Sequence, residues 1–325
     1  MQEVRWGIIG CGNVTELKSG PAFSKVASSK LVAVMRRNAA KARDYAKRHG
    51  NEKWYDDAQK LIDEPDVNAI YIATPPSSHL SYTLAAIKAG KPVYVEKPMS
   101  LNFPEAKQMY MAARQADVKL VVAHYRRAQP MFLKIKSLLD DKTIGDVRFV
   151  QLQLLQSPVN SVVANSEENW RINPSVSGGG LFHDLAPHQL DLMLYFFGKV
   201  KDQKGFSRNS AKISAADDLV TGQLLFENGI LFNGTWCFSV DGHDAADRCE
   251  IVGSKGKIAF PTFGNHIEIT VNGDTTLVEF EPLQHVQEPM IAKVVDYFLS
   301  KGDNPCNGEV ASETMMLMDS FTSNR

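Results

Sequence analysis

The stretch that decides the fold runs from residue 4 to residue 15 and reads Val4-Arg5-Trp6-Gly7-Ile8-Ile9-Gly10-Cys11-Gly12-Asn13-Val14-Thr15. Its first half is short, apolar and rich in β-branched residues, which is typical of a buried strand. Gly10 then allows a tight turn, and Gly12 allows a ligand to approach the backbone closely. Thr15 stands where the third glycine of such a turn is usually found. The order of strand, turn and helix carries more weight than the glycines, because a second Gly-x-Gly occurs at residues 178–180.

The first 122 residues repeat this alternation of short apolar runs and helical patterns. Strands are predicted at Val4–Ile9, Leu31–Met35, Ala69–Ala73, Pro92–Val95 and Lys119–Ala123, and helices at Ala39–His49, His79–Ala89 and Phe103–Ala116. Strands that alternate with helices form βαβ units and a parallel sheet. Residues 1–122 are therefore expected to form a doubly wound dinucleotide-binding domain. Gly10, Gly12 and the amides at Asn13 and Val14 would meet the pyrophosphate.

From residue 123 onward the pattern changes to long alternating runs, which antiparallel strands with one wet face explain. Strands are predicted at Val147–Gln156, Leu219–Glu227, Ile230–Phe238 and His266–Val271, and helices at about Met131–Leu139, His183–Phe197, Glu288–Ser300 and Val310–Ser320. The predicted fold class is thus α/β. Residues 123–325 would form a second, α+β domain with a large open, mainly antiparallel sheet.

Composition excludes several classes of function. The 325 residues carry 36 Lys and Arg against 37 Asp and Glu, a formal charge of -1, and no strongly basic run, so nucleic acid is not the expected main partner. No apolar stretch approaches the roughly 20 residues of a membrane span. The first residues lack the pattern of a targeting peptide, which favours a cytoplasmic protein. The four scattered cysteines are interpreted as free thiols. Cys11 would fill the tight turn rather than act as a nucleophile.

Two arginines follow the second predicted strand, where a dinucleotide site usually has an acidic residue beside the adenosine ribose. Arg36 and Arg37 occupy that strand end, and Lys41 follows in the next helix. A carboxylate would repel a 2′-phosphate, whereas a guanidinium binds it in a forked geometry. The sequence therefore predicts NADP(H) as the preferred cofactor, with NAD(H) as the alternative. Two arginines exposed at a strand end are the simpler interpretation of the same pair.

Three further segments accompany the glycine turn, and in order they read Tyr71-Ile72-Ala73-Thr74-Pro75-Pro76-Ser77-Ser78-His79, Val95-Glu96-Lys97-Pro98 and Gly178-Gly179-Gly180-Leu181-Phe182-His183-Asp184-Leu185-Ala186-Pro187-His188. Together they resemble the Gfo/Idh/MocA family of nicotinamide-dependent oxidoreductases, over nearly the whole chain. The resemblance implies a Rossmann domain followed by an open-sheet domain that commonly mediates oligomerisation, here as a homodimer or homotetramer. It also implies a small sugar, inositol or related polyol as substrate.

Lys97 is the first catalytic candidate. The Glu96-Lys97-Pro98 motif follows a predicted strand, and ligands bind at the carboxyl ends of strands in open α/β sheets. The resemblance implies that Lys97 approaches the nicotinamide and the substrate oxygen, and that its peptide bond to Pro98 is often cis. A lysine beside a carbonyl can donate a hydrogen bond and stabilise an alkoxide. Thr74, Pro75, His79 and Glu96 are expected near the cofactor, although His79 equally suits an exposed helix start.

The segment around residue 188 supplies the second set of candidates. Asp184, His188 and Asp191 are spaced by four and three residues, so a helix places them on one face. Pro187 suits that helix only if the helix begins close to it. Asp184 and His188 match the family's D-x-x-x-H pattern. His188 has the titration range for proton transfer, and Asp184 can orient a hydroxyl or the imidazole. His183, Asp184, His188 and Asp191 are also potential metal ligands, but no strong metal motif is present and none is predicted.

Four further residues are weaker candidates for contact with the substrate. In similar proteins the regions of Tyr125, Arg126, Trp170 and Arg171 approach the substrate, although an ordinary core Trp and a capping Arg explain them nearly as well.

The main prediction is an NAD(P)-dependent oxidoreductase acting on CH–OH groups. The alternatives are a non-catalytic dinucleotide-binding regulatory protein, a relative that uses transient oxidation for elimination or glycoside cleavage, and a dihydrodiol or biliverdin-type reductase acting on a non-sugar.

Overall fold

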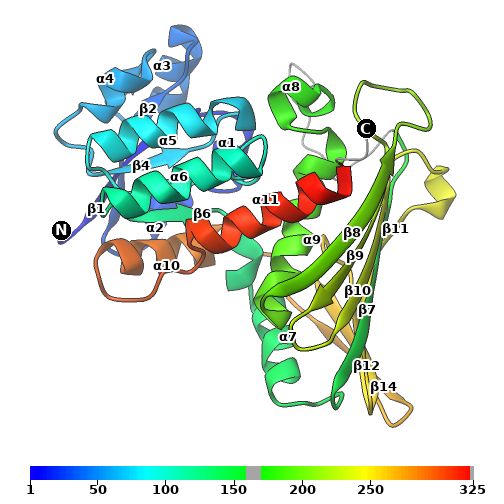
Figure 1. The fold of residues 1–325 in the computed structure, drawn as a ribbon. Coiled ribbons are helices and arrows are strands. Elements are labelled where there is room, and N and C mark those ends of the chain that lie inside the picture. The colour runs from blue at the N-terminus through cyan, green and yellow to red at the C-terminus, as the bar shows by residue number, and fades with distance from the viewer. Residues whose placement is uncertain (159–169, 323–325) are drawn as a thin grey trace. The chain divides into compact units, whose positions relative to one another are not determined.

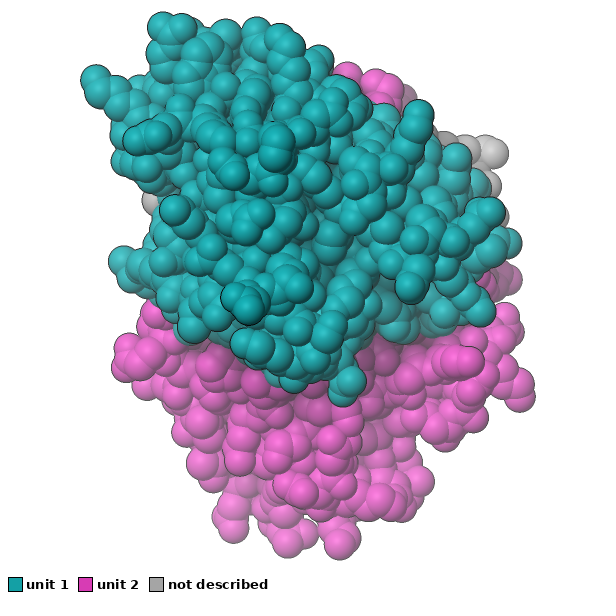
Figure 2. Space-filling view, turned by 90° about the vertical axis from the view of Figure 1, so that its left-hand side faces the viewer, with its two compact units in different colours: residues 1–128, 283–315 teal, residues 129–282, 316–325 magenta. Residues whose placement is uncertain are grey.

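The computed structural model describes residues 1–158 and 170–322. The chain divides into two compact units, which Figure 2 shows in different colours. Unit 1 comprises residues 1–128 and 283–315, and unit 2 comprises residues 129–282 and 316–325. Unit 1 therefore combines the N-terminal part of the chain with a later segment.

Unit 1 is built on a six-stranded sheet in the order β3-β2-β1-β4-β5-β6, and all five strand pairs are parallel (Figure 1). This confirms the predicted Rossmann sheet. The strands are β1 (Val4–Ile9), β2 (Ser29–Met35), β3 (Lys53–Tyr55), β4 (Ala69–Ile72), β5 (Val93–Val95) and β6 (Leu120–Val122). The helices are α1 (Asn13–Leu17), α2 (Ala22–Lys25), α3 (Ala39–Arg48), α4 (Ala58–Ile62), α5 (His79–Lys88), α6 (Phe103–Gln115) and α10 (Glu288–Phe298), with 3-10 turns η1 (Pro76–Ser78) and η2 (Tyr125–Ala128).

The side chains of β1 show why this sheet is covered on both faces. Trp6 packs against Phe23 of α2 and Phe298 of α10, with ring centroids 4.8 and 5.5 Å apart. The next residue, Gly7, points to the other face, where an added Cβ would lie 2.6 Å from a methyl carbon of Leu61 in α4. Successive residues of a strand face opposite sides, so both faces of β1 are in the core.

Unit 2 contains an eight-stranded sheet in the order β14-β13-β12-β11-β7-β10-β9-β8. Only the pair β7 and β10 is parallel, so the sheet is mixed and mainly antiparallel, as predicted. The strands are β7 (Val147–Leu155), β8 (Val200–Arg208), β9 (Leu219–Phe226), β10 (Leu231–Cys237), β11 (Ala246–Gly253), β12 (Gly256–Phe260), β13 (His266–Val271) and β14 (Asp274–Glu279). The remaining elements of unit 2 are α7 (Pro130–Asp140), η3 (Trp170–Ile172), α8 (Pro174–Ser177), α9 (Leu181–Phe197) and η4 (Gly242–Asp244). The last helix, α11 (Gly308–Thr322), belongs to unit 1 up to residue 315 and to unit 2 from residue 316.

One face of this second sheet forms a core. Trp236 of β10 packs against Phe182 of α9 and Phe321 of α11, with ring centroids 5.2 and 6.2 Å apart. The register places Phe149, Phe206, Leu231 and Leu277 on the opposite face, where they are 41%, 59%, 52% and 57% exposed. The predicted alternation of buried and exposed residues is therefore present, with large apolar side chains on the outer face.

Helix α9 corrects one detail of the sequence analysis. The helix begins at Leu181, so Pro187 lies inside it rather than close to its start. Proline has no amide hydrogen, and its ring crowds the carbonyl four residues earlier, here that of His183. Proline disfavours a helix interior but does not prohibit one, and most of α9 is buried apolar surface that favours the helix. Asp184 and His188 consequently lie on one continuous helix.

Within residues 1–158 and 170–322, no helix is long and apolar enough to cross a membrane. A cytoplasmic location stays a prediction.

Candidate functional site

Four strands of unit 1 end at the same level of the sheet. Ile9 of β1 is in register with Met35 of β2 on one side and with Ile72 of β4 on the other, and Ile72 pairs with Val95 of β5. The residues that follow these ends start the glycine turn, the Arg36-Arg37 pair, the Thr74-Pro75 segment and the Glu96-Lys97 motif. The strand order reverses between β1 and β4, which is where open α/β sheets bind ligands. Separate sequence motifs therefore meet at one edge.

Glycine stands at positions 10 and 12 of the turn for two different structural reasons. Gly10 has a φ of +97°, and an added Cβ would lie 2.8 Å from the amide nitrogen of Thr74. At Gly12 the nearest atom to an added Cβ is the Gly10 carbonyl oxygen at 3.9 Å, so the space there is open. Gly10 is thus required by the fold, whereas Gly12 keeps a cradle open beside the backbone. An open cradle at the start of a helix fits a dinucleotide pyrophosphate.

Thr15 replaces the third glycine and is fully buried. Its hydroxyl donates to the Gly12 carbonyl at 2.8 Å and lies 2.9 Å from the Gly12 amide nitrogen. The carbonyl of Thr15 accepts a hydrogen bond of 2.9 Å from the hydroxyl of Tyr45 in α3. The threonine therefore fastens the turn to its own helix and to α3.

Cys11 fills the turn, as expected. Its side chain is fully buried, and burial raises the pKa of the thiol to about 12. The thiolate is the nucleophilic form of cysteine, so a thiol with this pKa is unreactive near neutral pH. All four cysteines are free, and only Cys237 is not buried.

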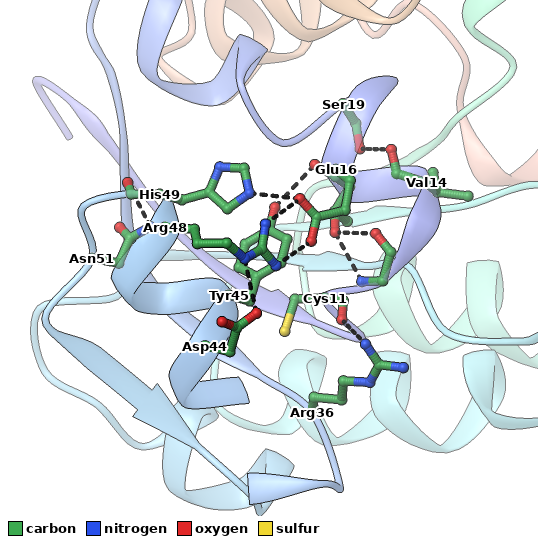
Figure 3. A network of polar contacts seen from close by, with 12 residues as sticks. Cys11, Val14, Glu16, Ser19, Arg36, Asp44, Tyr45, Arg48, His49 and Asn51 are labelled. Carbon is green, nitrogen blue, oxygen red and sulfur yellow. Dashed lines mark hydrogen bonds and ion pairs between the residues drawn. The ribbon is translucent and has the colours of Figure 1, made fainter. Parts of the chain in front are cut away.

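Arg36 reaches back over the glycine turn. Its Nη1 donates to the carbonyl oxygen of Cys11 at 3.4 Å (Figure 3), while Arg37 is exposed. The acidic residue of the same region, Glu16, has both carboxylate oxygens bonded to Arg48, at 2.6 and 2.9 Å. The Arg48 guanidinium, with a smaller contribution from His49, lowers the pKa of Glu16. The carboxylate next to the turn is thus paired, and a guanidinium lies beside the turn.

His79 is fully buried, so the interpretation as an exposed histidine is wrong. Its Nε2 lies 2.7 Å from the Thr74 carbonyl oxygen, and its Nδ1 lies 3.0 Å from the Pro98 carbonyl oxygen. Burial lowers the pKa of the imidazole. A neutral imidazole carries one N–H and donates to one of these two oxygens. His79 therefore joins the Thr74-Pro75 segment to the segment that contains Lys97.

Glu96 is only 6% exposed and accepts three hydrogen bonds. Its Oε1 lies 2.5 Å from the Tyr71 hydroxyl and 2.6 Å from Nε2 of Gln287, and its Oε2 accepts from the Lys97 amide at 3.2 Å. Lys97 itself is partly exposed, and the Lys97–Pro98 peptide bond is cis, as the resemblance implied. Gln287 was missed by the sequence analysis. It lies in the loop before α10, 191 residues from Glu96, in a segment without a recognisable motif.

In unit 2, two predicted residues form an ion pair. Nε of Arg171 lies 2.9 Å from Oδ2 of Asp184, and the two side chains are 9% and 12% exposed. The guanidinium also lies over the ring of Trp170, 4.5 Å from its centroid. In the sequence, Trp170 and Arg171 were one weak indication, and Asp184 was assigned apart from them. They form one cluster of a carboxylate, a guanidinium and an aromatic face.

His188 lies one helical turn beyond Asp184 on α9 and is 4% exposed. Its ring meets the ring of Phe263 edge to face, with centroids 5.7 Å apart. Phe263 is fixed in turn, since its amide and that of Thr262 donate to the two carboxylate oxygens of Asp247 at 2.6 and 2.9 Å. Phe263 and Asp247 are therefore further residues that the sequence analysis missed.

Tyr125 and Arg126 belong to η2 of unit 1. Tyr125 is 5% exposed, and the guanidinium of Arg126 lies 5.7 Å from the centroid of its ring. Across the two described ranges, no three His, Cys, Asp or Glu side chains are grouped as metal ligands would be.

Comparison with known proteins agrees with this geometry. The model of the oxidoreductase family with an NAD-binding Rossmann fold, GFO/IDH/MocA, matches residues 4–124, and that of the GFO/IDH/MocA C-terminal domain matches residues 132–259. A protein of Formosa agariphila named oxidoreductase P35 is 48% identical over 98% of both chains. The chain belongs to the GFO/IDH/MocA family. It is an NAD(P)-dependent oxidoreductase.

Other proteins that resemble this chain are named for different compounds. A trans-1,2-dihydrobenzene-1,2-diol dehydrogenase of Xenopus laevis is 26% identical over 88% of this chain and 83% of its own. A solved structure of levoglucosan dehydrogenase in complex with NADH and levoglucosan is 22% identical, has a TM-score of 0.86 and covers 98% of this chain and 96% of its own. This structural likeness shows the fold.

Proposed function

We propose that this protein is an NADP(H)-preferring oxidoreductase that interconverts a secondary alcohol and a carbonyl on a sugar, an inositol or a related polyol. The observation that carries the proposal is the common level at which β1, β2, β4 and β5 end. The glycine turn, Arg36 and Lys97 all follow these ends. A dinucleotide bound in the cradle at Gly12 would lie along this edge of the sheet. We therefore place Lys97 beside the nicotinamide, which is the part of the dinucleotide that reacts.

The cofactor would supply the hydride acceptor or donor, and Gly10, Gly12, Asn13, Val14, Thr74 and Pro75 would hold it. Lys97 would donate a hydrogen bond to the substrate oxygen and stabilise the negative charge that develops there. His188 would take up or release the proton of the hydroxyl group. Asp184, held by Arg171, would orient a neighbouring hydroxyl. These roles are proposed for each residue from its chemistry and its own surroundings.

The preference for NADP(H) rests on Arg36. Its guanidinium lies against the glycine turn, at the strand end where the adenosine ribose of a bound dinucleotide is found. Arg37 adds a second positive charge next to it. A 2′-phosphate would be attracted by both, whereas a ribose hydroxyl gains little from either. NAD(H) remains the alternative cofactor.

A polyol as substrate is supported by the cluster in unit 2. The Arg171–Asp184 pair offers donors and an acceptor for hydroxyl groups, and the ring of Trp170 offers an apolar face for the C–H side of a sugar ring. The second candidate is a dihydrodiol. It is favoured by the dihydrodiol dehydrogenase among the relatives, which has 26% identity. A cyclic diol would use the same donors with a more apolar ring contact.

Self-association is part of the proposal. The outer face of the unit 2 sheet exposes Phe149, Phe206, Leu231 and Leu277. Phe149 and Leu231 are direct neighbours on adjacent strands, and exposed large apolar side chains on a sheet face are typical of an interface. We therefore propose a homodimer or homotetramer that forms through this sheet, and light scattering combined with size-exclusion chromatography measures the mass directly.

The experiment that tests the function is a turnover screen with a Lys97 variant. Wild-type protein is assayed with NADP(H) and NAD(H) against keto-sugars, polyols, inositols and a trans-dihydrodiol, following absorbance of the reduced nicotinamide. Lys97→Met should lower kcat by about a thousandfold, while the Kd for NADPH stays within about twofold. Equal loss of turnover and of dinucleotide binding would show that Lys97 has a structural role. Turnover of none of these compounds by a protein that binds NADPH would favour a regulatory function instead.

A further inference from the structure

A buried hydrogen-bond network lies directly behind Lys97, and it includes a residue from the later segment of unit 1. We propose that Gln287 and Tyr71 are positioning residues for Lys97. They hold the carboxylate of Glu96, and Glu96 holds the main chain of Lys97. The inference rests on the catalytic role proposed above for Lys97 and adds two residues to which the sequence assigned no role.

The geometry of the Glu96 carboxylate carries this inference. Tyr71 and Gln287 both donate to Oε1, at 2.5 and 2.6 Å, while Oε2 accepts from the Lys97 amide at 3.2 Å. Both oxygens are thus used, and a rotation of the carboxylate breaks several bonds at once. Tyr71 and Gln287 are fully buried, so water does not replace a lost donor easily. The amide of Lys97 is therefore fixed by two side chains that do not touch it.

The same two residues connect Lys97 to the glycine turn. The hydroxyl of Tyr71 lies 3.0 Å from Oγ of Ser19, and the backbone amide of Gln287 donates to the carbonyl of Lys18 at 3.3 Å. Lys18 and Ser19 directly follow α1, the helix that begins at the turn. The network therefore fixes the Lys97 segment relative to the element that would hold the pyrophosphate.

Stability alone does not account for a buried carboxylate at this place. An apolar residue of similar volume is often as stable as a buried charged group, because burial of the charge costs solvation energy. The side-chain amide of Gln287 also has a partner for its oxygen, because the Tyr94 hydroxyl donates to Oε1 at 3.1 Å. A fully satisfied network of this kind selects one arrangement of the chain. Here that arrangement sets the position of Lys97.

Two variants and a matched control test the proposal. Tyr71→Phe and Gln287→Met each remove one donor to Glu96 and keep the approximate volume of the side chain. The control is Tyr55→Phe, because the Tyr55 hydroxyl also donates to a carboxylate, Glu64 Oε2, at the same distance of 2.5 Å. Tyr55 belongs to β3 at the edge of the same sheet, away from Lys97. The control therefore removes the same kind of bond without altering the network.

The measurement is hydrogen–deuterium exchange of the complete protein without cofactor, read in a peptide that spans residues 95–101. We expect exchange at the Lys97 amide to rise about tenfold in both test variants, with other unit 1 peptides within about twofold of wild type. Tyr55→Phe should leave this peptide unchanged. Where turnover is measurable, kcat should fall about tenfold in Tyr71→Phe, while KM and the Kd for NADPH stay within about twofold.

Unchanged exchange at Lys97 in both test variants overturns the proposal. Faster exchange throughout unit 1 also overturns it, because the network would then have a general folding role. Failure of the proposed function is seen in the wild-type protein, which would then bind no dinucleotide, or would bind one and turn over no substrate. The exchange experiment still reports, independently of that result, whether Tyr71 and Gln287 hold the Lys97 segment.

Discussion

Arg171 donates from its Nε to Oδ2 of Asp184 at 2.9 Å, and both side chains are nearly buried. Two residues that the sequence assigned separately to the substrate are thus partners. This bond holds the Asp184 carboxylate against the Arg171 guanidinium. In the proposed function, a substrate hydroxyl group at Asp184 would meet an oriented carboxylate.

Removal of Arg171 should therefore cost stability as well as substrate affinity. In Arg171→Met the nearly buried carboxylate of Asp184 loses its paired charge, and we expect the free energy of unfolding to fall by about 3 kcal/mol. Urea denaturation measures this change. The double variant Arg171→Met with Asp184→Asn should recover part of the loss, because no uncompensated charge remains. A change of less than about 0.5 kcal/mol in the single variant would mean that the pair is exposed in solution.

The two glycines of the turn should respond differently to the same substitution. Gly10→Ala places a Cβ 2.8 Å from the Thr74 amide nitrogen at a φ of +97°, so the protein should be strongly destabilised. Gly12→Ala has open space within the protein, and its melting temperature should stay close to that of wild type. Its Kd for NADPH should nevertheless rise about tenfold or more, because the methyl group occupies the cradle. Normal NADPH binding by a folded Gly12→Ala protein would place the pyrophosphate elsewhere.

His79 predicts a pH dependence of stability. Burial lowers the pKa of its imidazole in the folded protein below the ordinary value of 6.5. As pH falls below about 6.5, the unfolded chain takes up a proton that the folded state resists, so folding stability decreases by at most about 1.4 kcal/mol per pH unit. The contribution of His79 to the free energy of unfolding is therefore fully present above about pH 6.5 and decreases as the pH falls below it.

His79→Gln removes this titration. The difference in unfolding free energy between wild type and the variant should therefore shrink as the pH is lowered from about 7.5 to about 5. Urea denaturation of both proteins over this range measures it. A constant difference would mean that folding leaves the pKa of the imidazole unchanged, and a growing difference would mean that folding raises it.

Arg36→Asp tests the origin of cofactor preference. A carboxylate at this strand end repels a 2′-phosphate and accepts hydrogen bonds from a ribose, so the ratio of the Kd for NADPH to the Kd for NADH should rise by about a hundredfold. Fluorescence titration with each reduced dinucleotide gives both constants. An unchanged ratio in Arg36→Asp would show that the guanidinium does not meet the 2′-phosphate.

Much of the fold follows from local sequence patterns. The runs at Val4–Ile9 and His266–Val271 have the predicted bounds, because each is a strand with a clear apolar pattern between turn residues. The strand β3 (Lys53–Tyr55) was missed because three half-buried residues at a sheet edge have little periodicity. The strand β8 (Val200–Arg208) was missed because it is also an edge strand and is largely polar. Edge strands of this kind are fixed by their neighbours rather than by their own residues.

The site was predictable only as separate motifs. Glycine turns and the Glu96-Lys97-Pro98 motif are local in sequence, and the parallel sheet brings them to one edge. Gln287 has no such pattern, and its contact with Glu96 depends on a segment that returns to unit 1 late in the chain. The pairing of Arg171 with Asp184 likewise depends on tertiary structure. Long-range hydrogen bonds of this kind are specified by the fold, and a single sequence does not reveal them.

The most direct test of the central claim is a fluorescence titration of purified wild-type protein with NADPH and with NADH, after its absorbance spectrum has been checked for retained cofactor. The open cradle at Gly12 and the guanidinium of Arg36 predict saturable binding of both, with the Kd for NADPH lower by about tenfold or more. Equal affinity or tighter binding of NADH would contradict the preference. Binding of neither by folded, cofactor-free protein would contradict the assignment of this edge of the sheet as the dinucleotide site.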